Sequence, residues 1–138
     1  MTVAGDDAGS GAGGAVRPVE PFDLPEWLGE GEVVWTAATS LDGRNRVEGE
    51  LRGGEERLGC DVLAIDQAWP APVLAEEWRR AAHGEWSRGE VLLVRFHDRL
   101  TLVVPGTSLA ADTVLQVVGR LARSVGVPPS RFLVALRP

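Results

Sequence analysis

Few residues of this chain could carry out nucleophilic or acid–base chemistry. The sequence contains one cysteine, Cys60, and two histidines, His83 and His97. A nucleophile needs its base within hydrogen-bond reach, and no local motif places Cys60 or a hydroxyl beside either imidazole. His83 falls on the polar side of a predicted helix, and His97 falls at a predicted hairpin tip. An enzyme built around Cys60, His83 and Asp61 is therefore kept as a third hypothesis only.

The sequence also lacks the common patterns of metal and cofactor sites. The spacings His-x-x-x-His and Cys-x-x-Cys do not occur, and a single cysteine cannot form an internal disulfide. The segment GAGG at residues 11–14 has no strand before it and no helix after it, as a dinucleotide or P-loop motif requires. We therefore expect no metal and no cofactor.

One candidate anion site lies at the turn formed by residues 105–108, directly before a predicted helix. The N-terminus of a helix offers unpaired N–H groups to an anion, and Thr107 or Ser108 suits the capping position. Arg120 and Arg123 fall on the polar side of the same helix. A small-molecule or anion-responsive module using Thr107, Ser108, Arg120 and Arg123 is our second hypothesis, and an ordinary capped turn explains the same residues.

Five tryptophans are the most suggestive feature of the composition. A buried core position is the default for tryptophan, but the residue is also enriched at protein interfaces. Trp35 falls on the polar face of a predicted hairpin, and Trp86 falls at the edge of a helical stripe. We predict that both contact a partner. The first hypothesis is a non-catalytic protein-binding domain, chaperone-like or regulatory, whose partner the sequence does not identify.

The charge and the apolar pattern of the sequence argue against nucleic-acid-binding, membrane-spanning and secreted proteins. The chain has 138 residues and a net charge of −6, which argues against nucleic-acid binding because such proteins normally carry a basic surplus. No apolar run approaches the roughly 20 residues that span a bilayer. Residues 1–16 contain Asp6 and Asp7 instead of a basic region, so we predict no secretory signal and a cytoplasmic location. Residues 1–20, rich in Gly and Ala, predict a disordered tail before a single domain at 21–138.

The apolar pattern predicts nine elements in the order (short α)-β-β-β-α-β-β-α-β. The short helical turn lies within residues 21–29, where Phe22, Leu24, Trp27 and Leu28 are expected to pack on the core. The two main helices are expected at about 73–87 and 107–125, and the last strand at 132–136. The fold class is α+β, an antiparallel sheet of five or six strands with both main helices on one face.

Two hairpin registers follow from turn chemistry and apolar faces. A two-residue turn at Asp42-Gly43 places Val34 opposite Leu51 and turns Trp35 outward. For the second hairpin, a three-residue loop at residues 97–99 aligns one wholly apolar face, with Leu92, Val94 and Phe96 opposite Val104, Leu102 and Leu100. We predict this register.

Up to the last helix, the element order resembles the type III secretion chaperone-like fold of the YbjN-like bacterial proteins. The best-matching part is EVLLVRFHDRLTLVVPG at residues 90–106, followed by a capped helix, and the resemblance covers about residues 23–126. It implies a non-enzymatic, often dimeric, binder of other proteins. Two helices on one face also leave the second sheet face uncovered, so we predict a homodimer that Trp35 joins.

Overall fold

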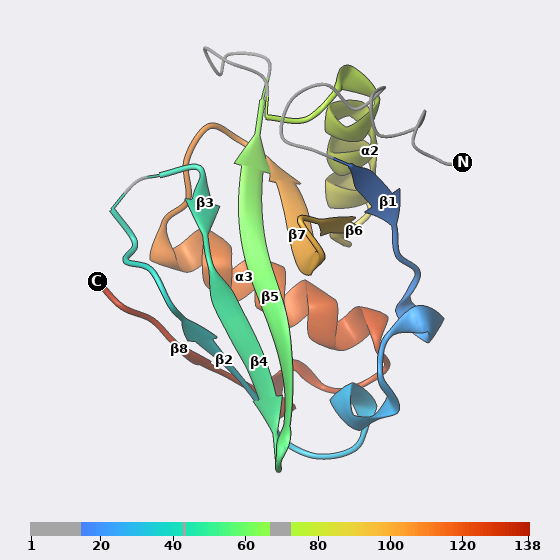
Figure 1. Cartoon of the computed structure of the whole chain (residues 1–138), viewed down its shortest axis with the longest axis vertical. Coiled ribbons are helices and arrows are strands. Elements are labelled where there is room, and N and C mark those ends of the chain that lie inside the picture. The colour runs from blue at the N-terminus through green and yellow to red at the C-terminus, as the bar shows by residue number, and fades with distance from the viewer. Residues whose placement is uncertain (1–14, 43, 67–72) are drawn as a thin grey trace.

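The computed structural model describes residues 15–42, 44–66 and 73–138. Two α-helices, three short 3-10 turns and eight strands make up this part of the chain (Figure 1). The helices are α2 (Glu76–Ser87) and α3 (Ala111–Ser124), and the turns are η1 (Pro21–Asp23), η2 (Glu26–Gly29) and η3 (Pro129–Arg131). The strands are β1 (Val16–Pro18), β2 (Val33–Ala37), β3 (Arg46–Val47), β4 (Gly49–Gly53), β5 (Glu56–Ile65), β6 (Leu92–Phe96), β7 (Arg99–Pro105) and β8 (Phe132–Ala135).

The strands form one mixed sheet in the order β1-β6-β7-β5-β4-β2-β8, with β3 also paired to β5. The α+β class is confirmed, but a purely antiparallel sheet of five or six strands is wrong. The pairs β5–β7 and β2–β8 are parallel. Strand β6, which is antiparallel to β7, returns the chain before β7 pairs with β5, and helix α3 returns the chain before β8 pairs with β2.

The two helices cover opposite faces of the sheet, which corrects the prediction that they share one face. Val62 and Ala64 of β5 belong to the larger core cluster, together with the apolar stripe of α3. Leu63 and Ile65, which point the other way in a strand, belong to a second cluster with Ala82 of α2. The central strands are therefore buried on both faces within one chain. The sheet-coverage argument for a homodimer fails here, and the oligomeric state stays a prediction.

The first hairpin is shifted by one residue from the predicted register. Trp35 pairs with Leu51 and Val34 with Arg52, so Trp35 faces the core and is fully buried. The expectation that Trp35 protrudes to a partner is wrong. The connection between β2 and β3 is also longer than a two-residue turn, and Gly43 within it lies outside the described residues. A shift of one residue exchanges the faces of a strand.

The second hairpin also differs from the prediction. Phe96 pairs with Arg99 and Val94 with Thr101, across a two-residue turn at His97 and Asp98. Both turn residues have positive φ, 56° and 63°, as a type I′ turn requires. The predicted three-residue loop assumed that the apolar face excludes polar residues. Instead, this face holds Arg99 and Thr101.

The folded region begins before residue 21. Strand β1 pairs with β6 at the sheet edge, and the Val19 N–H donates to the Leu93 carbonyl at 3.0 Å. Val16 packs on the cluster around α2. The predicted tail boundary at residue 20 is therefore wrong for residues 16–19, while residues 1–14 lie outside the described part.

Candidate functional site

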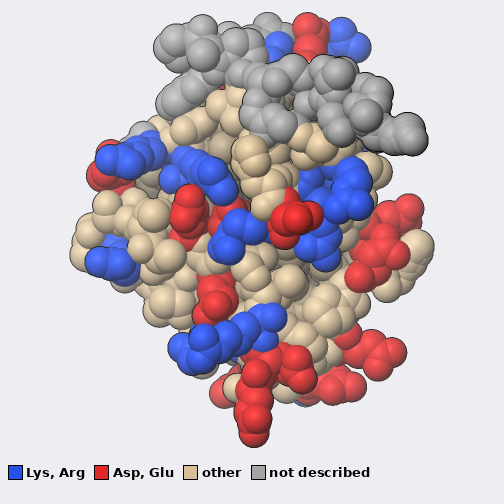
Figure 2. Space-filling view, in the orientation of Figure 1, with Lys and Arg blue, Asp and Glu red and all other residues tan. Residues whose placement is uncertain are grey.

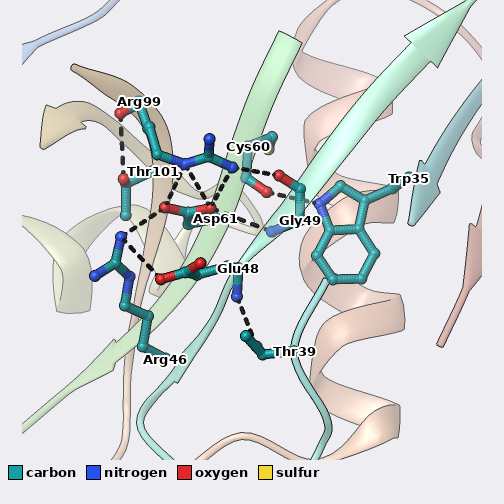
Figure 3. Close-up of polar contacts among 9 residues, drawn as sticks. All are labelled: Trp35, Thr39, Arg46, Glu48, Gly49, Cys60, Asp61, Arg99 and Thr101. Atoms are coloured by element: carbon teal, nitrogen blue, oxygen red, sulfur yellow. Dashed lines mark hydrogen bonds and ion pairs between the residues drawn. The ribbon is translucent and has the colours of Figure 1, made fainter. Parts of the chain in front are cut away.

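The most connected polar group in the described structure is the buried carboxylate of Asp61. Its oxygens accept hydrogen bonds from Arg99 Nε and Nη2 at 3.0–3.1 Å, from Arg46 Nη2 at 2.9 Å and from the Gly49 N–H at 3.2 Å. Figure 3 shows the two guanidinium groups approaching this carboxylate from β7 and β3. The hydrogen bonds that Arg99 donates to Asp61 raise the pKa of Arg99. Asp61 thus joins four strands, which is a structural role.

The local backbone explains this arrangement. The pairings Val47–Val62 and Glu50–Gly59 share one register, and the ladder is interrupted between them. The Gly49 N–H lies in that gap and turns to Asp61. Gly59 leaves room for Arg99 to cross β5, because a Cβ there would lie 2.6 Å from the Arg99 Nη1 atom.

The residues of the enzyme hypothesis do not come together. Cys60 and Asp61 are neighbours in β5 and therefore point to opposite faces of the sheet. The Cys60 side chain is fully buried, and burial, with a smaller effect from the Asp61 charge, raises its thiol pKa. His83 is exposed on α2 beside Arg79 and Arg80. A protonated, inaccessible thiol is not a nucleophile.

The anion hypothesis also lacks an assembled site. Helix α3 begins at Ala111, and its cap Ala110 contributes no side-chain hydrogen bond, so neither Thr107 nor Ser108 caps it. Because a helix rises about 1.5 Å per residue, Arg120 lies about 14 Å along the axis from Ala111. The structure therefore separates the two arginines from the turn.

Arg120 instead joins the two helices. Its Nη1 donates to the Trp86 carbonyl at 3.0 Å and to the Glu90 carbonyl at 3.4 Å, at the end of α2. The guanidinium carbon lies 3.3 Å from the centre of the Trp86 ring, a cation–π contact. Burial, with a smaller effect from Arg123, lowers the pKa of Arg120. Trp86 is half-buried, and Arg120 covers one face of its ring. That face is therefore not available for the predicted contact with a partner.

A surface groove lies where η1 and η2 meet the end of α3. Phe22 beside it is 72% exposed, the largest exposure among the large apolar side chains described. This corrects the expectation that Phe22 packs on the core, whereas Leu24 and Leu28 do so. The groove encloses about 560 Å³, and its lining is mainly apolar: Pro21, Phe22, Leu24, Pro25, Gly29, Val125 and Gly126, with Glu26, Arg123 and Ser124.

A second hollow continues the groove along the start of β6. It shares Pro21 and Ser124 with the first, encloses about 280 Å³ and is lined by Val19, Glu20, Glu85, Glu90, Val91, Leu92 and Leu93. We call the two hollows together the Phe22 groove. Their combined volume falls in the range of sites that hold small ligands or peptide side chains, about 300–1,000 Å³.

The rim of the Phe22 groove is acidic. Glu20, Glu26, Glu85 and Glu90 line it, against Arg123 as the basic residue. Glu85 pairs with Arg88, while Glu20, Glu26 and Glu90 form no ion pair with any described residue. Figure 2 shows acidic side chains along the lower right edge of the molecule, where η1 and η2 lie in Figure 1. The sequence contains a signal for this acidic rim, because residues 20–32 hold Glu20, Asp23, Glu26, Glu30 and Glu32 and no basic residue.

No protein-family model, curated protein sequence or solved structure matches this chain. Within the described residues, no helix is long and apolar enough to cross a membrane. The same residues contain no group of His, Cys, Asp and Glu side chains arranged to hold a metal ion. The Phe22 groove is the candidate site because it combines an exposed aromatic side chain with a mainly apolar lining.

Proposed function

We propose that this chain is a non-catalytic protein-binding domain and that the Phe22 groove is its contact surface. The observation that carries the proposal is the 72% exposure of Phe22 beside a mainly apolar groove. Fully burying a phenylalanine side chain contributes about 1.5–3 kcal/mol. Aromatic residues at the centre of an interface commonly supply most of its binding energy.

The backbone holds Phe22 in a fixed place. The Asp23 N–H donates to the Glu20 carbonyl at 2.8 Å, and the Leu24 N–H donates to the Pro21 carbonyl at 3.1 Å. Leu24 and Leu28 anchor the two short turns in the core on either side of Pro25. An ordered contact surface loses little conformational entropy on binding. The exposed ring is therefore presented to a partner at low entropic cost.

A chaperone-like and a regulatory role both use such a surface. The resemblance to the type III secretion chaperone-like fold stays a prediction, and so does the homodimer. The chaperone-like and the regulatory role differ in what the partner does after binding. Identification of the partner distinguishes them.

Affinity capture from the native host with matched variants tests the proposal. Phe22→Ser removes the exposed ring, and Leu115→Ser and Leu133→Ser remove the other large exposed apolar side chains, which are 48% and 46% exposed. We expect the same partner with the wild type and both control variants, and its loss with Phe22→Ser at unchanged melting temperature. An identical set of captured proteins with Phe22→Ser would contradict the proposal.

A further inference from the structure

We infer that the partner of the Phe22 groove presents a basic segment in which apolar side chains alternate with arginine or lysine. This inference rests on the proposed function and names the chemistry of the partner. Its basis is the juxtaposition of a mainly apolar lining with three glutamates, Glu20, Glu26 and Glu90, that form no ion pair with any described residue.

The charges around the groove favour a cation. Glu20 and Glu90 lie on the hollow beside β6, and Glu26 lies on the hollow beside η2. All three are exposed, so they cost little to keep charged in the free protein. Arg123 is the opposing basic residue of the lining. A basic partner thus gains its attraction mainly at the hollow beside β6, whose lining includes glutamates and no basic residue, whereas Glu26 and Arg123 balance each other at the hollow beside η2.

The end of α3 adds to this preference. The helix ends at Ser124 with Val125 as its C-cap, and both residues line the groove. The C-terminus of a helix carries partial negative charge and favours a cation nearby. Helix polarity and rim glutamates therefore point to the same ligand charge.

Arg120 connects the two helices beside the groove. By donating to the Trp86 and Glu90 carbonyls, it holds the segment that carries Glu85 and Glu90 against α3. Glu85 and Glu90 are thus held in place relative to Ser124. An apolar side chain of the partner would enter beside Phe22, and a neighbouring cation would reach the rim.

Nuclear magnetic resonance of the full chain, titrated with designed peptides, tests this inference. The probe is a short blocked peptide of alternating leucine and arginine. One matched peptide replaces arginine by glutamate, another replaces leucine by serine, and spermidine supplies positive charge without an apolar anchor. We expect the Leu–Arg peptide to shift the amide signals of residues 20–29 and 124–126 most strongly, with an affinity that falls as salt is raised.

Charge reversal gives the second measurement. Glu26→Lys and Glu90→Lys are each expected to weaken the Leu–Arg peptide by about two- to five-fold, the range for exposed charge pairs. Glu77→Lys is the control, because it makes the same charge change in the first turn of α2, about 12 Å along the axis from Glu85. It should leave the affinity unchanged.

The outcomes separate this inference from the proposed function. Equal binding of the Leu–Glu peptide, or no effect of either charge reversal, overturns the basic partner and leaves the groove as a docking surface. Equal binding of spermidine overturns the protein segment as occupant. If no peptide shifts the groove residues while native capture still depends on Phe22, the partner chemistry is wrong and the proposed function stands. If capture is also independent of Phe22, both fail.

Discussion

Asp61 and Arg99 are joined side to side across the junction of β5 and β7, with both carboxylate oxygens within 3.1 Å of guanidinium nitrogens. The carboxylate is fully buried, whereas the Arg99 side chain is 39% exposed. Water therefore reaches one partner and not the other. Removal of Arg99 therefore costs more than removal of Asp61, because it leaves a buried carboxylate with fewer donors, whereas the guanidinium groups left by removal of Asp61 are partly exposed.

We expect Arg99→Ala to lower the free energy of unfolding by about 3–5 kcal/mol, because it leaves the buried Asp61 carboxylate without its two-point partner. Asp61→Ala should cost less, because water can hydrate part of the exposed guanidinium groups that it leaves behind. Arg52→Ala is the control, since its ion pair with Glu50 is exposed, and its effect should stay below about 1 kcal/mol. Urea denaturation measures all three. A loss below about 1 kcal/mol for Arg99→Ala would show that the cluster does not hold the strands together.

Gly49 is expected to tolerate no side chain. A Cβ there would lie 2.4 Å from the Trp35 ring, whose Nε1 donates to the Cys60 carbonyl at 2.9 Å. Gly49→Ala must therefore move the ring or the strand, at a cost of about 1–3 kcal/mol. Gly84→Ala in α2 is the matched control and should stabilise by about 0.5–1 kcal/mol, because alanine favours a helix and its nearest neighbour lies at 3.7 Å. Equal melting temperatures for the two variants would refute the packing of Trp35 described above.

The position of Trp35 shows why the register of the first hairpin could not be predicted from the sequence. Both frames of the first hairpin offer an apolar face, Val33, Trp35 and Ala37 or Val34, Thr36 and Ala38. The Asp42-Gly43 signal selected the second frame, although the connection is longer than that turn. Gly49 opposite Ala37 was the available clue, because only a residue without a side chain leaves room for the indole.

The register of the second hairpin was predicted wrongly for a related reason, which concerns Arg99. Counting apolar residues rejected the register that places Arg99 beside Phe96, since a charge on a buried face is costly. That cost is offset by Asp61, which lies far away in sequence and meets Arg99 through the parallel pairing of β5 and β7. From residue 21 onward the order of the main helices and strands is confirmed, apart from the division of one predicted strand into β3 and β4, because this order depends on local periodicity. Contacts between strands that are far apart in the sequence leave no such periodic pattern. The exposure of Phe22 left none either.

The Cys60 thiol should make stability depend on alkaline pH. The chain has no lysine and no tyrosine, so Cys60 is the side chain whose ordinary pKa, about 8.5, falls between neutrality and the arginine range. Burial raises its pKa in the folded state. The unfolded chain then loses this proton first, so stability is complete below the ordinary pKa and falls as pH rises above it, by up to about 1.4 kcal/mol per pH unit.

Urea denaturation between about pH 8 and pH 10.5 checks this dependence. The Cys60→Ala variant serves as the control, because the α-amino group and all other charges are the same in both proteins. We expect the stability curve of the wild type to decline more steeply than that of the variant. Parallel curves would mean that the thiol ionises equally well in the folded protein.

Removal of residues 1–20 should destabilise the fold. Such a truncation deletes β1 and the hydrogen bond from Val19 to Leu93 and uncovers part of the cluster around Phe96. We expect the melting temperature to fall by about 3–8 °C. A chain that begins at Ala15 keeps β1. We expect its melting temperature to be unchanged, because the removed residues 1–14 have a Gly- and Ala-rich composition. Equal melting temperatures for the two truncations would show that β1 contributes nothing to stability.

Photo-crosslinking at residue 22 in the native host tests the central claim most directly. A photoreactive phenylalanine analogue placed at Phe22, Leu115 or Leu133 probes the three large apolar side chains that are most exposed. We expect one discrete adduct with a partner protein from position 22 and none from the other two. We also expect Glu26→Lys to weaken this adduct. No adduct at position 22, or the same adducts from all three positions, would contradict the assignment of the Phe22 groove as the binding surface.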